Sequence, residues 1–172
     1  RWRCDHGWDI DLDDGSSNYH IYNNLCLHGG LKLREGFART VENNIMVNNT
    51  FHPHVWFANS QDIFRHNIVT TPYRPIQVKE WGKETDTNFF VTKQGLEQAQ
   101  KRGTDLHSLY GDPLFIAPEK GDYRVKENSP ALKTGFRNFD MEHFGVQCPH
   151  LKALAATPEL PVFKIPEEKP ET

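Results

Sequence analysis

"VENNIMV" (41–47) has three close counterparts in the chain: "IYNNLCL" (21–27), "FRHNIVT" (64–70) and "TDTNFFV" (85–91). Each segment carries an asparagine at its fourth place and an apolar residue directly after it. The four asparagines are Asn24, Asn44, Asn67 and Asn88, so the repeat is 20 to 23 residues long. Short β segments at this period are typical of a parallel β-solenoid, in which each coil buries its apolar face by stacking on neighbours. Stacked asparagines can also hydrogen-bond along such a stack.

A second set of segments alternates polar and apolar residues with a period of two. The segments are "DIDLD" (9–13), "LKLR" (31–34), "HVWF" (54–57) and "IQVK" (76–79). Aligning them predicts these inward-facing pairs: Ile10/Leu12, Leu31/Leu33, Val55/Phe57 and Ile76/Val78. The alternate residues are then predicted to face outward: Asp9, Asp11, Asp13, Lys32, Arg34, His54, Trp56, Gln77 and Lys79.

We therefore predict an all-β protein, a parallel β-helix of about four coils over residues 1–92. Residues 93–150 are expected to form a C-terminal cap, with a short helix in "KQGLEQAQKRG" (93–103) that ends at Gly103. The Pro- and Glu-rich end of the chain predicts an extended tail over residues 151–172. The first coil begins abruptly, so we also expect N-terminal coils of a longer protein as its partner.

Composition argues against several classes of function. The 172 residues carry a net charge of −3 without a Lys/Arg block, which disfavours nucleic acid and anionic membranes as partners. No apolar stretch approaches the roughly 20 residues that cross a bilayer. The cysteines, Cys4, Cys26 and Cys148, are too few and scattered for a disulfide framework or a zinc site. These features leave the compartment open, and a periplasmic or secreted bacterial protein is the favoured expectation.

The acidic run "DIDLDDG" (9–15) is the first candidate for a functional site. It fails the spacing of an EF-hand loop, because the sixth position from Asp9 is Asp14 and the twelfth is His20. Another geometry for Ca²⁺ is left open, and no other cofactor is expected. As a strand, the run places Asp11 and Asp13 on one face, beside the next coil. Glu35 follows Asp13 by 22 residues, so it should lie beside the end of the aspartate strand.

A pair of carboxyl groups suits glycoside cleavage, in which one protonates the leaving oxygen and the other attacks or activates water. Neighbouring cations would keep one carboxylate ionised, while a less solvated Glu35 could hold its proton. We expect a carbohydrate substrate, bound by Asp14, Lys32, Arg34, His52, His54 and Trp56. The competing interpretation is a row of cross-strand ion pairs on a solvated face, each worth about 0–1 kcal/mol.

These residues also resemble a known family. "GWDIDLDDGSSNYHIYNN…GGLKLREGF" with "NNTFHPHVW" resembles the right-handed parallel β-helix glycoside hydrolases, most closely family 120, the β-xylosidases. "DPLF…GDYRVKENSPALKTGF" is similar to the segment that closes many carbohydrate-active β-helix enzymes. The resemblance spans residues 5 to 140.

The resemblance implies a retaining mechanism with an Asp nucleophile and Glu35 as the acid/base. The nucleophile stays open among Asp11, Asp13 and Asp14. We prefer Asp13, which is predicted nearly beside Glu35 and suits the roughly 5–5.5 Å of a retaining pair. Asp11 is the second choice.

Two other classes of function remain open. A polysaccharide lyase on the same fold would use Lys32, Arg34 or Lys79 as base, with Ca²⁺ on the aspartates to neutralise a uronate carboxylate. A non-catalytic carbohydrate-binding or structural solenoid, or an inactive C-terminal portion of an enzyme, would need no catalytic pair.

Overall fold

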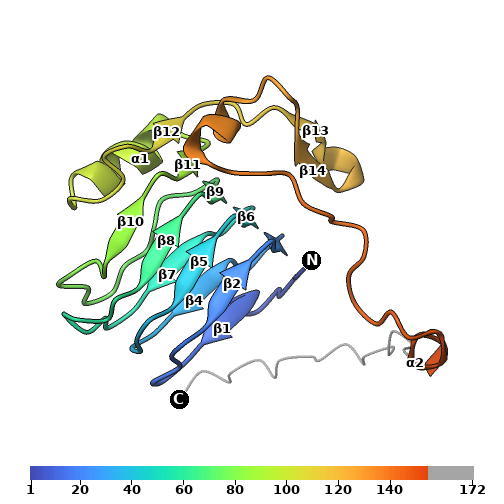
Figure 1. Cartoon of the computed structure of the whole chain (residues 1–172), viewed down its shortest axis with the longest axis horizontal. Coiled ribbons are helices and arrows are strands. Elements are labelled where there is room, and N and C mark those ends of the chain that lie inside the picture. The colour runs from blue at the N-terminus through green and yellow to red at the C-terminus, as the bar shows by residue number, and fades with distance from the viewer. Residues whose placement is uncertain (155–172) are drawn as a thin grey trace, which may run out of the picture. The chain divides into compact units, whose positions relative to one another are not determined.

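The computed structural model covers the whole chain and describes residues 1–154. The chain divides into two compact units, residues 1–142 and 143–172. The first unit is mostly β and forms a parallel β-solenoid of about five turns (Figure 1). The predicted fold class is therefore confirmed, with one turn more than the four coils expected from the sequence.

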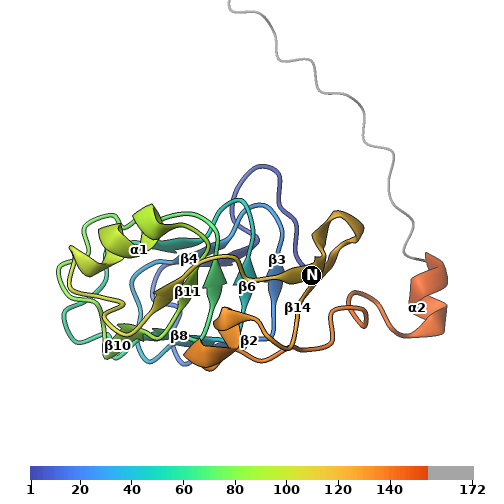
Figure 2. The same cartoon turned by 90° about the horizontal axis from the view of Figure 1, so that it is seen from above.

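Three parallel sheets run along the solenoid, and each complete coil adds one strand to each sheet (Figures 1 and 2). Sheet one contains β1 (Ile10–Leu12), β4 (Leu31–Leu33) and β7 (Phe51–Pro53). Sheet two contains β2 (His20–Tyr22), β5 (Thr40–Glu42), β8 (Ile63–Arg65) and β10 (Glu84–Asp86). Sheet three contains β3 (Leu25–Cys26), β6 (Ile45–Met46), β9 (Ile68–Val69), β11 (Phe89–Phe90) and β12 (Leu109–Tyr110).

The repeated heptapeptide does not form a single strand, because its third residue turns a corner between sheets two and three. This residue adopts a left-handed backbone conformation in every copy, with φ 54° at Asn23, 57° at Asn43, 55° at His66 and 53° at Thr87. Asparagine and histidine tolerate this region better than most residues. Each coil is therefore three-sided, whereas the sequence patterns predicted only two stacks of strands.

The asparagine that follows each corner builds the predicted ladder. The side-chain oxygen of Asn67 accepts hydrogen bonds from the backbone N–H and the side-chain amide of Asn44, both at 3.0 Å. In the same way, the side-chain oxygen of Asn44 accepts from the backbone N–H and side-chain amide of Asn24, and that of Asn88 accepts from those of Asn67. Asn44, Asn67 and Asn88 are completely buried. At the last rung the amide of Asn88 donates to the carboxylate of Asp105 at 2.9 Å, so an acid ends the ladder.

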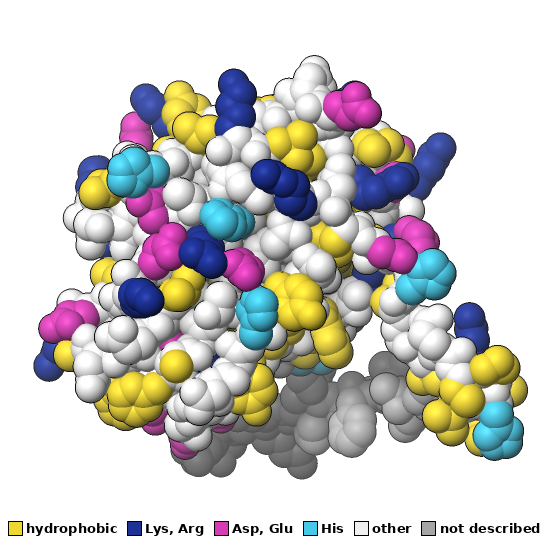
Figure 3. All heavy atoms as spheres, in the orientation of Figure 1, with side chains coloured by type: hydrophobic (Ala, Val, Ile, Leu, Met, Phe, Trp, Pro, Cys, Tyr) yellow, Lys and Arg dark blue, Asp and Glu magenta, His cyan; other side chains and the backbone are white. Residues whose placement is uncertain are grey.

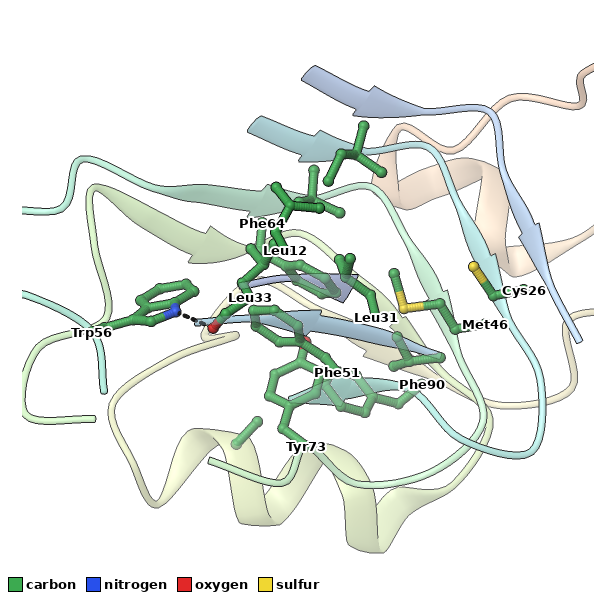
Figure 4. Close-up of a cluster of buried hydrophobic side chains, with 14 of the residues drawn as sticks. Leu12, Cys26, Leu31, Leu33, Met46, Phe51, Trp56, Phe64, Tyr73 and Phe90 are labelled. Atoms are coloured by element: carbon green, nitrogen blue, oxygen red, sulfur yellow. Dashed lines mark hydrogen bonds between the residues drawn. The ribbon is translucent and has the colours of Figure 1, made fainter. Parts of the chain in front are cut away.

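The interior of the solenoid is filled by the inward side chains of all three sheets (Figure 4). Leu31 and Leu33 are fully buried, as predicted, and Phe51 stacks on Phe64 with ring centroids 4.0 Å apart. Tyr73 closes this aromatic group with its ring edge toward Phe51. Burying apolar area at this density is the main stabilising contribution in such a fold.

Sheet three is covered on its outer face as well. The residues after each ladder asparagine, Leu25, Ile45, Ile68 and Phe89, form a second buried cluster with side chains of the cap. Those cap residues include Val125, Ala131, Phe136 and Met141. The apolar residue that follows each ladder asparagine is therefore covered by the cap and does not point into the solenoid.

The cap begins with the predicted helix, α1 (Lys93–Gln100). Thr92 is its N-cap, and the chain continues in a turn to Gly103, which has φ 85°. Leu96 and Ala99 pack against the interior cluster and close the end of the solenoid. The cap also contains the last rung, β12, the antiparallel hairpin of β13 (Phe115–Ala117) and β14 (Asp122–Val125), and the 3₁₀ turns η1 (Pro118–Lys120) and η2 (Pro130–Thr134).

The predicted inward residues of the third and fourth coils are partly wrong. Leu31 pairs with Phe51, so β7 lies three residues before the predicted segment 54–57. Val55 has φ 53°, which ends the strand and leaves Val55 and Phe57 exposed. In the fourth coil Ile76 forms a single bridge to the third coil and is exposed, although Val78 does pack against the core.

The second unit contains α2 (Pro149–Leu154), which spans the predicted start of the tail at residue 151. The rest of the predicted tail, residues 155–172, lies outside the described residues. Within residues 1–154, no helix combines the length and apolar character needed to cross a membrane.

Candidate functional site

The outer face of sheet one carries most of the predicted site residues. The sheet register places Asp11 beside Lys32, and Lys32 beside His52. The Lys32 side chain is only 8% exposed, and its Nζ contacts Asp11 Oδ1 at 2.8 Å and Asp13 Oδ1 at 3.2 Å. One buried cation therefore contacts two of the three candidate nucleophiles, Asp11 and Asp13.

Arg34, directly after β4, contacts three carboxylates. Its guanidinium lies 3.7 Å from Asp13, 3.0 Å from Asp14 and 2.9 Å from Glu35. We call Asp11, Asp13, Asp14 and Glu35, with Lys32 and Arg34, the carboxylate cluster. Glu35 and the end of the aspartate strand therefore lie close together, as predicted, because Arg34 contacts both.

The charges of the cluster favour ionised carboxylates. The hydrogen bond from Lys32 lowers the pKa of Asp13. A hydrogen bond from its own backbone amide lowers the pKa of Glu35, and Arg34 lowers it further, while the charge of Asp13 raises it. In the free protein Glu35 therefore does not hold its proton at neutral pH, contrary to the expectation from the sequence.

Trp8 and two histidines lie beside the cluster. Lys32 Nζ lies 4.4 Å from the centre of the Trp8 ring, a cation–π contact, and both His52 and His54 meet this ring edge-on at 5.9 Å. Burial lowers the pKa of His52 to about 4, and burial with the charges of Lys32 and Arg34 lowers the pKa of His54. Both imidazoles are therefore neutral near pH 7, and His54 Nε2 is buried with no hydrogen-bond partner among residues 1–154.

Sequence reasoning missed the role of Trp8, which depends on Asp9. Asp9 was predicted to join the outward aspartates, but its carboxylate accepts hydrogen bonds from the backbone N–H groups of Cys4, His28 and Gly30. These bonds fold the segment before β1 back along the neighbouring coil. The only signal in the sequence was a tryptophan directly before an aspartate, and this pair by itself does not indicate which residue of the next coil the ring contacts.

Trp56 does not line the site, so its predicted role in substrate binding is wrong. The left-handed Val55 turns Trp56 inward, where it is 4% exposed. Its indole Nε1 donates to the carbonyl oxygen of Leu33 at 3.0 Å (Figure 4). Trp56 instead holds, from the inside, the backbone that leads to Arg34.

Arg39 is a second internal support that the sequence analysis did not single out. It is completely buried, and it donates to both carboxylate oxygens of Asp62 at 3.0 and 2.6 Å. It also donates to the carbonyl oxygen of Arg34. The carbonyls of Leu33 and Arg34 are thus both bound by buried donors immediately before Glu35.

A second charged row lies on sheet two. Glu42 accepts hydrogen bonds from His20 and Arg65 at 2.9 Å each, and Arg65 also contacts Glu84 at 3.3 Å. Figure 3 views the molecule from this side, and acidic and basic side chains alternate there. Each carboxylate in this row has a cation beside it, and we assign the row no chemistry.

Comparison of the chain with known protein families, curated proteins and solved structures finds no match. Within residues 1–154, no three His, Cys, Asp or Glu side chains are placed to hold a metal ion together. The carboxylate cluster is therefore described from its own geometry. It unites all the predicted site residues of the first two coils, with His52 and His54 beside it and Trp56 beneath it.

Proposed function

We propose that this protein is a glycoside hydrolase acting on plant-type oligosaccharides, with a β-xylosidase-like retaining mechanism. Asp13 is the nucleophile and Glu35 the acid/base, with Asp11 as the alternative nucleophile. The proposal rests chiefly on Arg34, whose guanidinium lies within 3.7 Å of Asp13 and 2.9 Å of Glu35. A shared guanidinium keeps the two carboxyl groups near each other, and glycoside hydrolysis requires such a pair, with carboxyl separations of roughly 5–9.5 Å.

The charges around Asp13 and Glu35 suggest a different role for each of these two acids. Lys32 keeps Asp13 ionised, as a nucleophile must be, by a hydrogen bond of 3.2 Å. Glu35 must gain a proton before it can act as an acid, although its pKa is lowered in the free protein. A sugar bound across the cluster would exclude water from Glu35, and this desolvation would raise the pKa of Glu35.

The same contacts give less support to a lyase. A lyase would need a neutral amine or guanidine as base, but the hydrogen bonds from Lys32 to Asp11 and Asp13 outweigh its burial and raise the pKa of Lys32. The pKa of Arg34 is also raised, first by the charge of Asp14. A protonated Lys32 is better suited to holding a nucleophilic aspartate than to abstracting a proton.

The test is release of p-nitrophenol from an aryl β-xyloside by the wild-type chain and by Glu35→Gln and Asp13→Asn. We expect Asp13→Asn to lower kcat/KM by about 100-fold or more, because it removes the nucleophile. Glu35→Gln should lower kcat by about as much, because p-nitrophenol leaves without protonation and Glu35 is then needed as the base of the second step. Glu119→Gln in η1, an exposed carboxylate in the cap, is the matched control and should keep full activity. Circular dichroism checks that every variant is folded.

Full activity in Glu35→Gln would refute the assignment of Glu35. Inactive wild-type protein that still binds xylo-oligosaccharides would favour the non-catalytic interpretation. An unsaturated product that absorbs in the ultraviolet, formed from a uronate polymer, would favour the lyase.

A further inference from the structure

Two phenylalanines at the edge of the carboxylate cluster expose much of their surface. Phe37 is 41% exposed and Phe57 is 42% exposed. Their rings stack with centroids 5.0 Å apart and an interplanar angle of 18°. Phe37 follows Glu35 by two residues, so their Cα atoms lie within about 7 Å. Two stacked and exposed aromatic rings beside polar groups offer a flat apolar surface to a ligand.

Phe57 covers one face of the Phe37 ring, and the first coil places only small residues beside Phe37. Ser17 lies beside Phe37 in that coil, and Asn18 N–H donates to the Phe37 carbonyl at 2.9 Å. The Ser17 hydroxyl accepts from Phe37 N–H at 2.9 Å and donates to the Gly15 carbonyl at 2.8 Å, so it is turned toward the backbone. Gly15 has open space where a side chain would begin.

Polar groups of the cluster border these small residues. Gly15 N–H donates to the Glu35 carbonyl at 2.9 Å, which places the small residues directly beside the end of β4. Asp14, which precedes Gly15, is exposed, and Arg34 contacts it at 3.0 Å. An aromatic face next to a carboxylate and a guanidinium matches a pyranose ring, which has an apolar face of C–H groups and a rim of hydroxyls.

We propose that Phe37, supported by Phe57, is a stacking platform for one sugar ring of an oligosaccharide, with Gly15 and Ser17 as the floor. Asp14 and Arg34 bind the hydroxyls of this ring. The proposal rests on the proposed function, because the next ring of the same oligosaccharide would lie across Asp13 and Glu35. It adds a second subsite, so the protein binds oligosaccharides better than monosaccharide glycosides.

The experiment is an NMR titration of the full chain carrying Glu35→Gln with xylotetraose, followed on backbone amide signals. We expect the signals of Gly15, Ser17 and Phe37 to shift. Phe37→Ala should weaken binding by about tenfold, which is the size of one lost aromatic contact, whereas Phe37→Tyr should change it by less than about threefold. Tyr22→Ala, which removes an exposed ring on sheet two, is the matched control and should bind like the parent.

The results distinguish a failure of the proposed subsite from a failure of the proposed hydrolysis. Unchanged affinity in Phe37→Ala, shifts confined to sheet two, or no binding at all would overturn the subsite. If Phe37→Ala loses binding while Glu35→Gln in the otherwise wild-type chain keeps full hydrolysis, the subsite stands and the assignment of Glu35 fails. If Glu35→Gln abolishes hydrolysis while Phe37→Ala binds normally, the proposed function stands without this subsite.

Discussion

The asparagine ladder makes a quantitative prediction at Asn67. Its side chain is completely buried and takes part in four hydrogen bonds. It accepts two from Asn44, and it donates to the Val41 carbonyl at 3.1 Å and to Asn88 Oδ1 at 3.1 Å. Asn67→Ala removes all four bonds and takes the acceptor away from the buried backbone N–H of Asn44. The Asn44 amide keeps the carbonyls of Ile21 and Glu42, and Asn88 Oδ1 keeps the backbone N–H of residue 67.

An unsatisfied buried polar group costs about 1–3 kcal/mol, and water entering the space left by the amide would satisfy some of the partners. We therefore expect Asn67→Ala to lower the free energy of unfolding by about 3–5 kcal/mol. Such a loss is a large part of the roughly 5–15 kcal/mol that stabilises a typical domain. Asn24→Ala, at the more exposed end of the ladder, should cost only about 1 kcal/mol.

The assay is urea unfolding followed by tryptophan fluorescence and circular dichroism, with free energies extrapolated to water. Asn59→Ala is the matched control, because Asn59 is exposed in a turn and the substitution should change stability by less than about 0.5 kcal/mol. A loss below about 1 kcal/mol at Asn67, or equal losses at Asn24 and Asn67, would refute the argument that buried amides hold the coils together.

Three further predictions concern single buried groups. Asp62→Asn leaves the buried Arg39 without its counter-ion and should destabilise the fold by about 3–5 kcal/mol in urea unfolding; a loss under about 1 kcal/mol would show that the pair is dispensable. Burial raises the pKa of Asp105 to about 6, so its contribution to stability is present below about pH 4 and is lost as pH rises through 6. The free energy of unfolding of Asp105→Asn minus that of wild type should therefore rise by about 3 kcal/mol from pH 4 to pH 7. A difference that stays constant over this pH range would contradict the argument. Gly30→Ala drives a Cβ into the carbonyl oxygen of Thr50 in the next coil, whereas Gly15→Ala meets open space at a similar positive φ. Thermal unfolding should show a clearly larger loss for Gly30→Ala, and equal losses would mean that only the backbone conformation matters.

Much of the fold was predictable because a solenoid repeats the same environment in every coil. The spacing of Asn24, Asn44, Asn67 and Asn88 predicts parallel stacking, since each buried amide needs an acceptor one coil away. The third coil was not placed correctly, because residues 51–57 alternate in a way that fits two registers. The left-handed conformation of Val55 decides between them, and no pattern in the sequence predicts it for a β-branched residue.

The candidate site was likewise predictable from the sequence only in part. The sequence by itself determined that the aspartate strand lies beside Lys32 and Arg34, because the repeat length sets which residues of adjacent coils are neighbours. Only the tertiary structure decided that Trp56 turns inward and that Trp8 covers Lys32. These contacts depend on loop conformations and buried charges, which lie outside the repeat and carry no periodic signal.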